Sequence, residues 1–399
     1  GGGVAAPKGF TANGIHCGIR KNKEKKDLAL IYCEKNCDAA AVYTQNLVCG
    51  APITVTRENI SDGKARAIVC NSGIANTCNA DGVEKAEEMC KITADALGIS
   101  KSDIVVASTG VIGQPIDLEP IKNGMAKLVS GLNKDGSDSA ANAIMTTDTV
   151  KKEFACEFSL GGKKCRIGAI SKGSGMIHPN MATMLSVTTT DAKISHDLLQ
   201  EMVSEIVSDS FNMISVDRDT STNDTYLVLA NGESGVEIKA GTNGYVKFKE
   251  ALSFVATDLA KQMAADGEGA TRLMEVRAVH CKNKEEAKIF SKSVVTSNLV
   301  KAMVFGKDAN WGRVLCALGY SGADFDPDVI DLILEAEDEQ IVLVKDGVPT
   351  DYSEDEATIL LGKDAVAFIC DMKQGDASAI AWGCDLTYDY VKINGDYRS

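Results

Sequence analysis

The threonine at position 183 is a candidate nucleophile, because it follows a turn-rich segment and opens an apolar stretch. The segment 172–185 reads KGSGMIHPNMATML. A threonine hydroxyl is a weak nucleophile that needs a neighbouring base. A cut between Ala182 and Thr183 would create an α-amine, whose ordinary pKa of about 8 suits that role near neutral pH. A sharply turned segment would favour attack of the Thr183 hydroxyl on the preceding carbonyl, although an Ala-Thr pair taken alone is far more often structural.

Two further segments carry groups that suit such chemistry. The segment ASTGVIG (107–113) follows an apolar run and offers the Thr109 hydroxyl and the Gly110 amide, in a turn, as donors for an oxyanion hole. The segment DGEGATR (266–272) places Glu268 between glycines just before another apolar run, which suits contact with a ligand. Each segment, considered separately, is also compatible with an ordinary solvated turn.

Other common site chemistries have little support. The sequence lacks the glycine patterns of nucleotide-binding loops and the GxSxG elbow of serine hydrolases. The 4 histidines are dispersed and none of the 13 cysteines has CxxC spacing, so we expect no metal site. So many thiols are typical of a reducing compartment, and no apolar run is long enough to span a membrane. Together they predict a cytoplasmic protein, and the mature form of an organellar protein would look the same. The net charge of -14 disfavours nucleic acid as a partner.

Apolar periodicity predicts the elements that must position these groups. Strands are expected at 28–32, 65–70, 103–108, 165–170, 225–230, 272–279, 341–345 and 386–394. Helices are expected at 83–97, after Ser195, at 251–264 and at 284–304, and a loop at 131–143. Because strands often follow strands without an intervening helix, the sequence favours an α/β fold of stacked mixed β-sheets flanked by helices over a doubly wound parallel sheet.

Taken together and in order, these segments resemble the ornithine acetyltransferase family, the glutamate N-acetyltransferases of the acetyl-cycling arginine pathway. The resemblance extends from residue 6 to residue 399 and is carried by KGSGMIHPNMATML, STGVIG, DTSTND, DGEGATR, FGKDANWGR and INGDYRS. It implies a self-processing, N-terminal-nucleophile-like sandwich with a second, smaller α/β lobe. It also implies a cut at Ala182-Thr183, which would give an α chain of 1–182 with the oxyanion hole and a β chain of 183–399 with the nucleophile.

The resemblance further implies the reaction. Thr183 would take the acetyl group from N-acetyl-L-ornithine and pass it to L-glutamate in a ping-pong cycle, with Thr109 and Gly110 as the oxyanion hole. Lys172 would bind a substrate carboxylate, and Glu268 would hold the cationic end of ornithine or relay a proton. No cofactor is implied, although bifunctional members also accept acetyl-CoA, and two αβ units are expected to form a heterotetramer. The implied substrate contacts are Thr146, Lys172, Thr183, Glu268, Asn394 and Ser399.

Three positions depart from the family pattern, and two other functions stay open. His178 stands where the family often has a small residue, Arg218 where we expect glycine, and Ser399 where threonine is commoner. An N-terminal-nucleophile amidohydrolase or aminopeptidase would share the acyl-threonine but would use water as the acceptor. A non-catalytic binding protein would share only the fold and would never cut itself.

Overall fold

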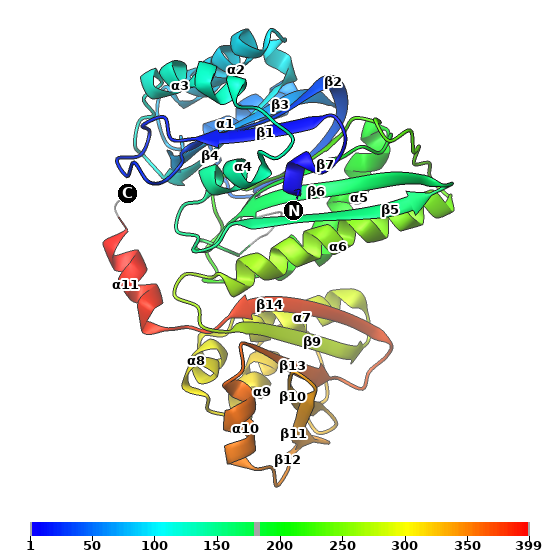
Figure 1. The fold of residues 1–399 in the computed structure, drawn as a ribbon. Helices are drawn as coiled ribbons and strands as arrows, with labels where there is room; N and C mark the ends of the chain where they lie inside the picture. The colour runs from blue at the N-terminus through cyan, green and yellow to red at the C-terminus, as the bar shows by residue number, and fades with distance from the viewer. Residues whose placement is uncertain (1, 179–183, 398–399) are drawn as a thin grey trace.

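The computed structural model describes residues 2–178 and 184–397, which form two lobes (Figure 1). The larger lobe contains an eight-stranded sheet and the smaller lobe a six-stranded sheet. No helix within these described ranges is long and apolar enough to cross a membrane.

The larger sheet is mixed, as the sequence predicts. Its strands lie in the order β4-β3-β2-β8-β7-β6-β5, and β1 pairs with β2. The pairs β3/β4 and β7/β8 are parallel, whereas the other pairs are antiparallel. The bounds of its strands are β1 Phe10–Ile15, β2 Leu28–Tyr43, β3 Lys64–Ile74, β4 Ile104–Val111, β5 Lys152–Leu160, β6 Lys163–Lys172, β7 Leu185–Thr190 and β8 Thr225–Ala230.

Helices cover both faces of this sheet (Figure 1). Helices α1 to α3 pack on one face of β2 to β4, α4 packs on the opposite face, and α5 and α6 pack under β6 to β8. Strand β8 is buried throughout because its two faces meet different cores: Tyr226 and Val228 face α5 and α6, and Leu227 and Leu229 face α4. The helices are α1 Ala51–Asn59, α2 Gly82–Leu97, α3 Glu119–Ser130, α4 Ser137–Ile144, α5 His196–Asp209 and α6 Asn243–Ala265.

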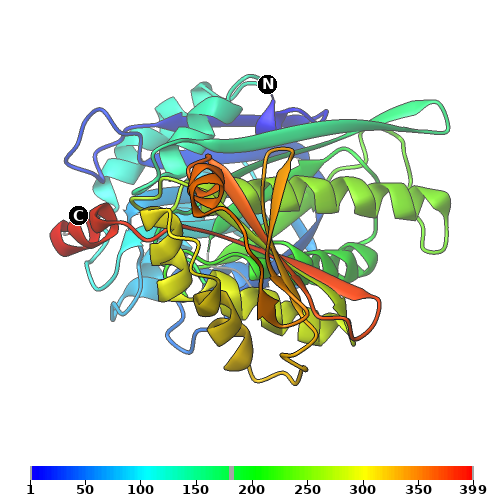
Figure 2. The ribbon, with the colours of Figure 1, turned by 90° about the horizontal axis from the view of Figure 1, so that it is seen from below.

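The smaller lobe is also a mixed sheet flanked by helices, seen from below in Figure 2. Its strand order is β12-β11-β10-β13-β9-β14, in which only β9 and β13 are parallel among the described strands. Its strands are β9 Leu273–Cys281, β10 Asp331–Ala336, β11 Glu339–Lys345, β12 Val348–Pro349, β13 Ala365–Asp371 and β14 Ala377–Cys384. Its helices are α7 Lys284–Val295, α8 Asn298–Gly306, α9 Trp311–Gly319, α10 Glu354–Leu361 and the C-terminal α11 Tyr388–Asp396.

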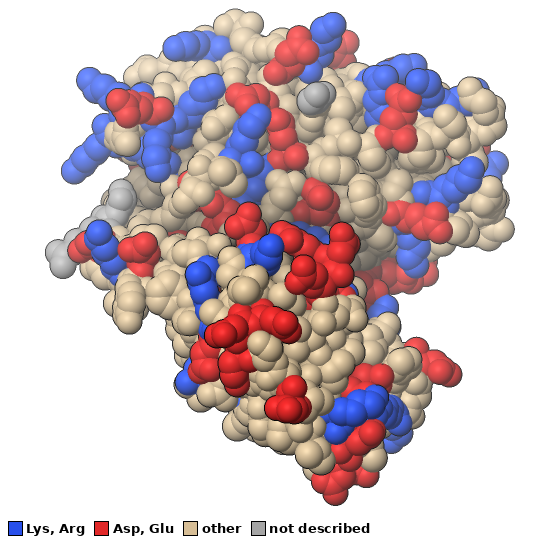
Figure 3. All heavy atoms as spheres, turned by 60° about the horizontal axis from the view of Figure 1, so that its bottom comes forward, with Lys and Arg blue, Asp and Glu red and all other residues tan. Residues whose placement is uncertain are grey.

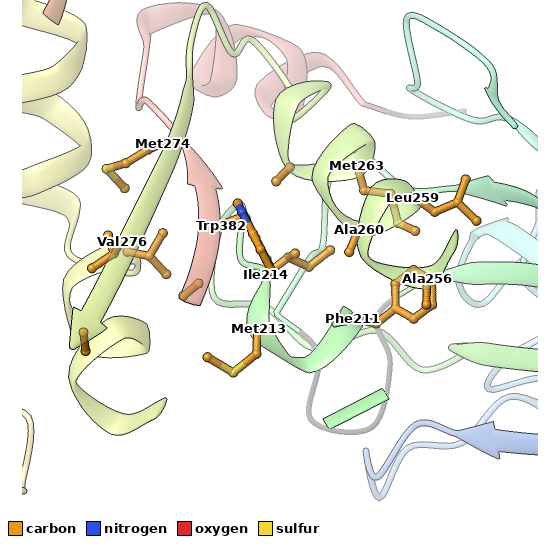
Figure 4. Packing of buried hydrophobic residues seen from close by; sticks show 14 of the residues in the cluster. Phe211, Met213, Ile214, Ala256, Leu259, Ala260, Met263, Met274, Val276 and Trp382 are labelled. Carbon is orange, nitrogen blue, oxygen red and sulfur yellow. The ribbon is translucent and has the colours of Figure 1, made fainter. Parts of the chain in front are cut away.

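Helix α6 lies between the two sheets and joins their cores. It contacts β5 and β6 of the larger sheet and β14 of the smaller one. Figure 4 shows Leu259 and Met263 of α6 in the same apolar cluster as Ile214 and as Met274 and Trp382 of the smaller lobe. The two stacked mixed sheets with helices between and around them confirm the predicted fold class.

Three element predictions were wrong, for identifiable reasons. Most of the alternating segment 386–394 lies in the exposed helix α11 and not in a strand. The preceding strand β14 ends at Cys384, because the next residue, buried Asp385, accepts hydrogen bonds from the Thr271 and Arg272 amides. Half of the expected loop at 131–143 is helix α4, whose alanines pack against β1. The expected helix at 284–304 is two helices, because Ser297 caps a new one by accepting from the Val300 amide.

The expected cut does not follow the boundary between the lobes. Strands β7 and β8 come after Thr183 in the chain, yet they lie in the middle of the larger sheet. Strand β7 pairs with β6, and β8 pairs with β2, both of which come before Thr183. An α chain and a β chain would therefore share one sheet and one core.

Candidate active site

The residues at the expected cut, Ala182 and Thr183, and the C-terminal Ser399 fall outside the described residues. On either side of the cut the chain belongs to neighbouring strands, since β6 ends at Lys172 and β7 begins with its antiparallel partner Leu185. The two ends of the intervening segment are thus fixed close together. The candidate site consists of the groups around them.

A small cavity of about 30 Å³ lies beside these strand ends. Thr109 lines it from the end of β4, Lys172 from the end of β6, and Met184 from the residue before β7. Two predicted site residues from distant parts of the chain therefore lie next to the residue that follows Thr183.

Thr109 and Gly110 belong to strand β4 and not to the turn that the sequence predicts. Gly110 has a φ of +131°, and a Cβ atom there would lie 2.2 Å from the carbonyl carbon of Gly73 on the neighbouring strand. Only glycine fits so close a pairing. The Asn223 side chain donates to the Ser108 carbonyl at 2.9 Å and fixes the same strand end. Donors held on a rigid strand meet the main requirement of an oxyanion hole.

Lys172 is a buried cation that faces the cavity. Its Nζ atom lies 4.0 Å from Oδ2 of Asp148, which is beyond hydrogen-bonding distance. Burial lowers the pKa of Lys172, while the Asp148 carboxylate acts in the opposite direction. An ammonium group whose counter-ion is this distant is suited to binding the carboxylate of a substrate.

Asp148, which the sequence analysis missed, organises the charges around Lys172. Its Oδ1 atom accepts from the Gly173 amide and from the Lys152 ammonium, each at 2.7 Å. Burial alone would raise the pKa of Asp148, but the charges of Lys172 and Lys152 hold that pKa below its usual range. Lys152 also contacts Asp266 at 2.6 Å, so this buried cation is fully paired and Lys172 is the one that faces the cavity.

Thr146, a predicted substrate contact, is joined to this group through Asp148. Its amide donates to Oδ2 of Asp148 at 3.0 Å. The neighbouring Thr147 hydroxyl shares a hydrogen bond of 2.7 Å with the Ser174 hydroxyl. The Thr146 segment therefore packs against the KGSG segment that begins at Lys172.

Glu268 and Asn394 contact each other directly, although 126 positions separate them in the chain. The Asn394 side chain donates to Oε2 of Glu268 at 2.6 Å, and the Glu268 amide donates to the Ser174 carbonyl at 2.9 Å. The Glu268 carboxylate lies against Gly175, where a Cβ atom would be 2.2 Å away. Because Gly175 lines the cavity, this pair adjoins the same site.

Asp217 anchors the segment that leads towards the expected cut, and the sequence analysis missed it. Its carboxylate accepts from the Met176 amide at 2.7 Å and from the Ile177 amide at 2.9 Å. It also accepts from the Tyr390 hydroxyl of α11 at 3.1 Å. Burial and the Asp217 charge raise the pKa of Tyr390, so its hydroxyl stays protonated as a donor. Asp217 thus links α11, which carries Asn394, to the turn-rich segment.

Two of the departures from the family pattern lie among the described residues. Arg218 has a φ of +69°, the left-handed region that favours glycine, which accounts for the expected glycine. The His178 ring shares a hydrogen bond of 3.0 Å with the Ser215 hydroxyl. Burial, and then the charges of Lys292 and Arg218, lower the pKa of His178 to about 4, so its ring is neutral at neutral pH.

The surface shown in Figure 3 carries charges of both signs, with acidic side chains gathered over the smaller lobe. This agrees with the net charge of -14. The two lysines at the candidate site, Lys152 and Lys172, are buried and therefore do not belong to this exposed charged surface.

Comparison with known proteins places this chain in a family. The model of the ArgJ family matches residues 11–399. The "Arginine biosynthesis bifunctional protein ArgJ 1" of Clostridium acetobutylicum is 50% identical over 98% of this chain and 96% of its own. The "Glutamate N-acetyltransferase" of Methanocaldococcus jannaschii is 46% identical over 100% of this chain and 99% of its own. A crystal structure of arginine biosynthesis bifunctional protein argJ from Bacillus halodurans, 44% identical, covers 52% of this chain and 97% of its own with a TM-score of 0.50. This chain belongs to the ArgJ family.

Proposed function

We propose that this protein is a glutamate N-acetyltransferase that moves the acetyl group of N-acetyl-L-ornithine to L-glutamate. The observation that carries the proposal is the convergence of Thr109, Lys172, Glu268 and Asn394 around the two chain ends that flank Thr183. The names of relatives at 46 to 50% identity agree with this activity.

The proposal includes a cut between Ala182 and Thr183, which turns Thr183 into the first residue of a β chain. The solved relative supports it, because 97% of that chain matches only 52% of this one. Curated relatives, in contrast, match 98 to 100% of this chain. A chain of half length is what a cut near the middle produces.

The predicted site residues divide the steps of the proposed cycle among them. The Thr183 hydroxyl attacks the acetyl carbonyl, its α-amine takes the proton, and Thr109 and Gly110 stabilise the oxyanion. Ornithine leaves with that proton, and the amine of glutamate then attacks the acetyl-enzyme. Lys172 binds the α-carboxylate that both substrates share, and Glu268, held by Asn394, faces an ammonium group. Thr146 orders this pocket through Asp148.

The test separates a transferase from a hydrolase that would use water as the acceptor. Purified protein is incubated with N-acetyl-L-ornithine, and ornithine release is followed with and without L-glutamate. We expect glutamate to accelerate release and to appear as N-acetylglutamate in equal amount. Release at one rate with or without glutamate would favour the amidohydrolase.

Thr183 variants test the nucleophile. We expect Thr183→Ala to abolish both the cut and transfer, because it removes the hydroxyl that both steps use. Thr183→Ser should retain part of both, because it keeps a hydroxyl. Intact-mass measurement shows whether the chain is cut, and the glutamate-dependent assay measures acetyl transfer. A Thr183→Ala protein that is cut and active would contradict the proposal.

The proposal also covers the assembly of the two chains, a second acetyl donor and the location of the protein in the cell. Two αβ units form a heterotetramer, which native mass measurement would detect. Acetyl-CoA replaces N-acetyl-L-ornithine if the protein is bifunctional, and an assay with acetyl-CoA and glutamate decides this. The thirteen cysteines are all free thiols in the structure, which supports a location in the reducing cytoplasm.

A further inference from the structure

The carboxyl group of Asp224 is buried in the cavity beside the expected cut, and no established role accounts for it. Asp224 is 2% exposed and lines the cavity with Thr109, Lys172 and Met184. Its Oδ2 atom is buried without a hydrogen-bond partner among the described residues. An unpaired buried carboxyl oxygen costs stability, so a position that retains one calls for a functional explanation.

The fold fixes where this carboxyl group lies relative to the cut. The parallel register pairs Leu185 with Thr225, and the Thr225 amide donates to the Met184 carbonyl at 2.8 Å. Asp224 therefore stands opposite Met184 at the start of the two strands. Met184 follows Thr183 directly in the chain, so Asp224 lies opposite the residue that adjoins the expected cut.

Burial of Asp224 favours the protonated form of its carboxyl group, and the nearby positive charge opposes this. Burial raises the pKa of Asp224 well above its usual value, while the Ser221 hydroxyl, the Lys172 charge and the Met184 amide act against that rise. Lys172 is the only other charged side chain among the described residues that line this cavity. The Lys172 ammonium interacts not only with Asp224 but also with the carboxylates of Asp148 and Glu268, and Lys152 repels it.

We infer that Asp224 is the acid that delivers a proton to the nitrogen released when the chain cuts itself at Thr183. This inference rests on the proposed self-cleavage. As the Thr183 hydroxyl oxygen bonds to the Ala182 carbonyl carbon, the bond from that carbon to the Thr183 nitrogen breaks. The nitrogen takes the Asp224 proton, and the resulting carboxylate takes the proton of the hydroxyl. Asp224 ends the step unchanged, and water then hydrolyses the ester.

The test follows cleavage of freshly synthesised full-length chain over time at a series of pH values. Asp224→Asn keeps the size of the side chain but holds no transferable proton. We expect it to cut at least ~100-fold more slowly than the natural chain, in the range of general acid catalysis. The natural chain should slow as pH rises and Asp224 ionises, and Asp224→Asn should lose that dependence on pH.

Asp191→Asn is the matched control. Asp191 is also a buried carboxylate, at the far end of β7, and it accepts from the Arg166 amide at 2.8 Å. We expect this control to cut at the natural rate with the natural pH profile. Thermal melting of each uncut chain checks folding, and Asp224→Ser replaces Asp224→Asn if the latter does not melt cooperatively.

The outcomes separate this inference from the proposed function. A natural chain that is never cut contradicts the proposed function and this inference together. A natural chain that is cut, beside an Asp224→Asn chain that is cut equally fast with the same pH profile, overturns only the role of Asp224. Slow cutting of both Asp224→Asn and Asp191→Asn would also overturn it, because any buried carboxylate would then have the same effect.

Discussion

At the scale of single residues, carboxyl groups from separate parts of the chain hold the candidate site together: Asp148 pairs with Lys152, and Asp217 accepts a hydrogen bond from Tyr390. Thr109, Lys172, Glu268 and Asn394 were identified from motifs, and all lie at or beside one cavity. The carboxyl groups of Asp148, Asp217 and Asp224 were missed, although each lies close to or within a segment that holds a predicted site residue or a motif. Their importance depends on burial and on partners distant in the chain, which residue type and spacing do not reveal.

Arg218 gives a prediction at this scale. Its φ of +69° strains any residue that has a Cβ atom, by roughly 1 kcal/mol. We expect Arg218→Gly to raise the free energy of unfolding by about 0.5–1 kcal/mol, because glycine adopts this conformation without strain. Arg218→Ala removes the guanidinium but keeps the Cβ atom, so it should bring no such gain. Denaturant unfolding of both variants measures their free energies of unfolding. Equal values for the two variants would contradict the predicted backbone strain at position 218.

At the scale of elements, long periodic segments were predicted well and the C-terminal segment was not. Strand β8 at 225–230 and helix α2 at 82–97 match their apolar patterns because each packs against a core. Helix α11 has no buried residue, although Tyr390 packs partly buried against the core, so its apolar alternation does not mark a core strand. Figures 1 and 2 both place α11 at the edge of the molecule. Side-chain bonds hold it there, from Tyr390 to Asp217 and from Asn394 to Glu268.

Tyr390 gives a prediction at this scale. Tyr390→Phe removes the hydrogen bond to Asp217, worth about 1 kcal/mol, and should loosen α11 and with it the Asn394–Glu268 pair. We expect the KM for substrate to rise roughly fivefold, the factor that 1 kcal/mol represents, with little change in Tm. Tyr388→Phe is the control, since it keeps the ring that packs on Phe305. Equal KM values for both variants would show that α11 does not order the site.

At the scale of the whole molecule, the sequence predicted the fold class but not the way a cut would divide it. The mixed sheets followed from strands that succeed one another without helices. That β7 and β8 lie inside the larger sheet could not be predicted, because strand order depends on pairings between distant segments. This order explains how two chains would stay together, since β7 remains bonded to β6 and β8 to β2.

The most direct test of the central claim is the mass of the β chain after the protein meets N-acetyl-L-ornithine without an acceptor. The account predicts a fragment that begins at Thr183 and carries one added acetyl group on that residue. It also predicts that L-glutamate removes this group and yields N-acetylglutamate. A protein that remains a single uncut chain, or a β chain that never carries the acetyl group while transfer proceeds, would contradict the account.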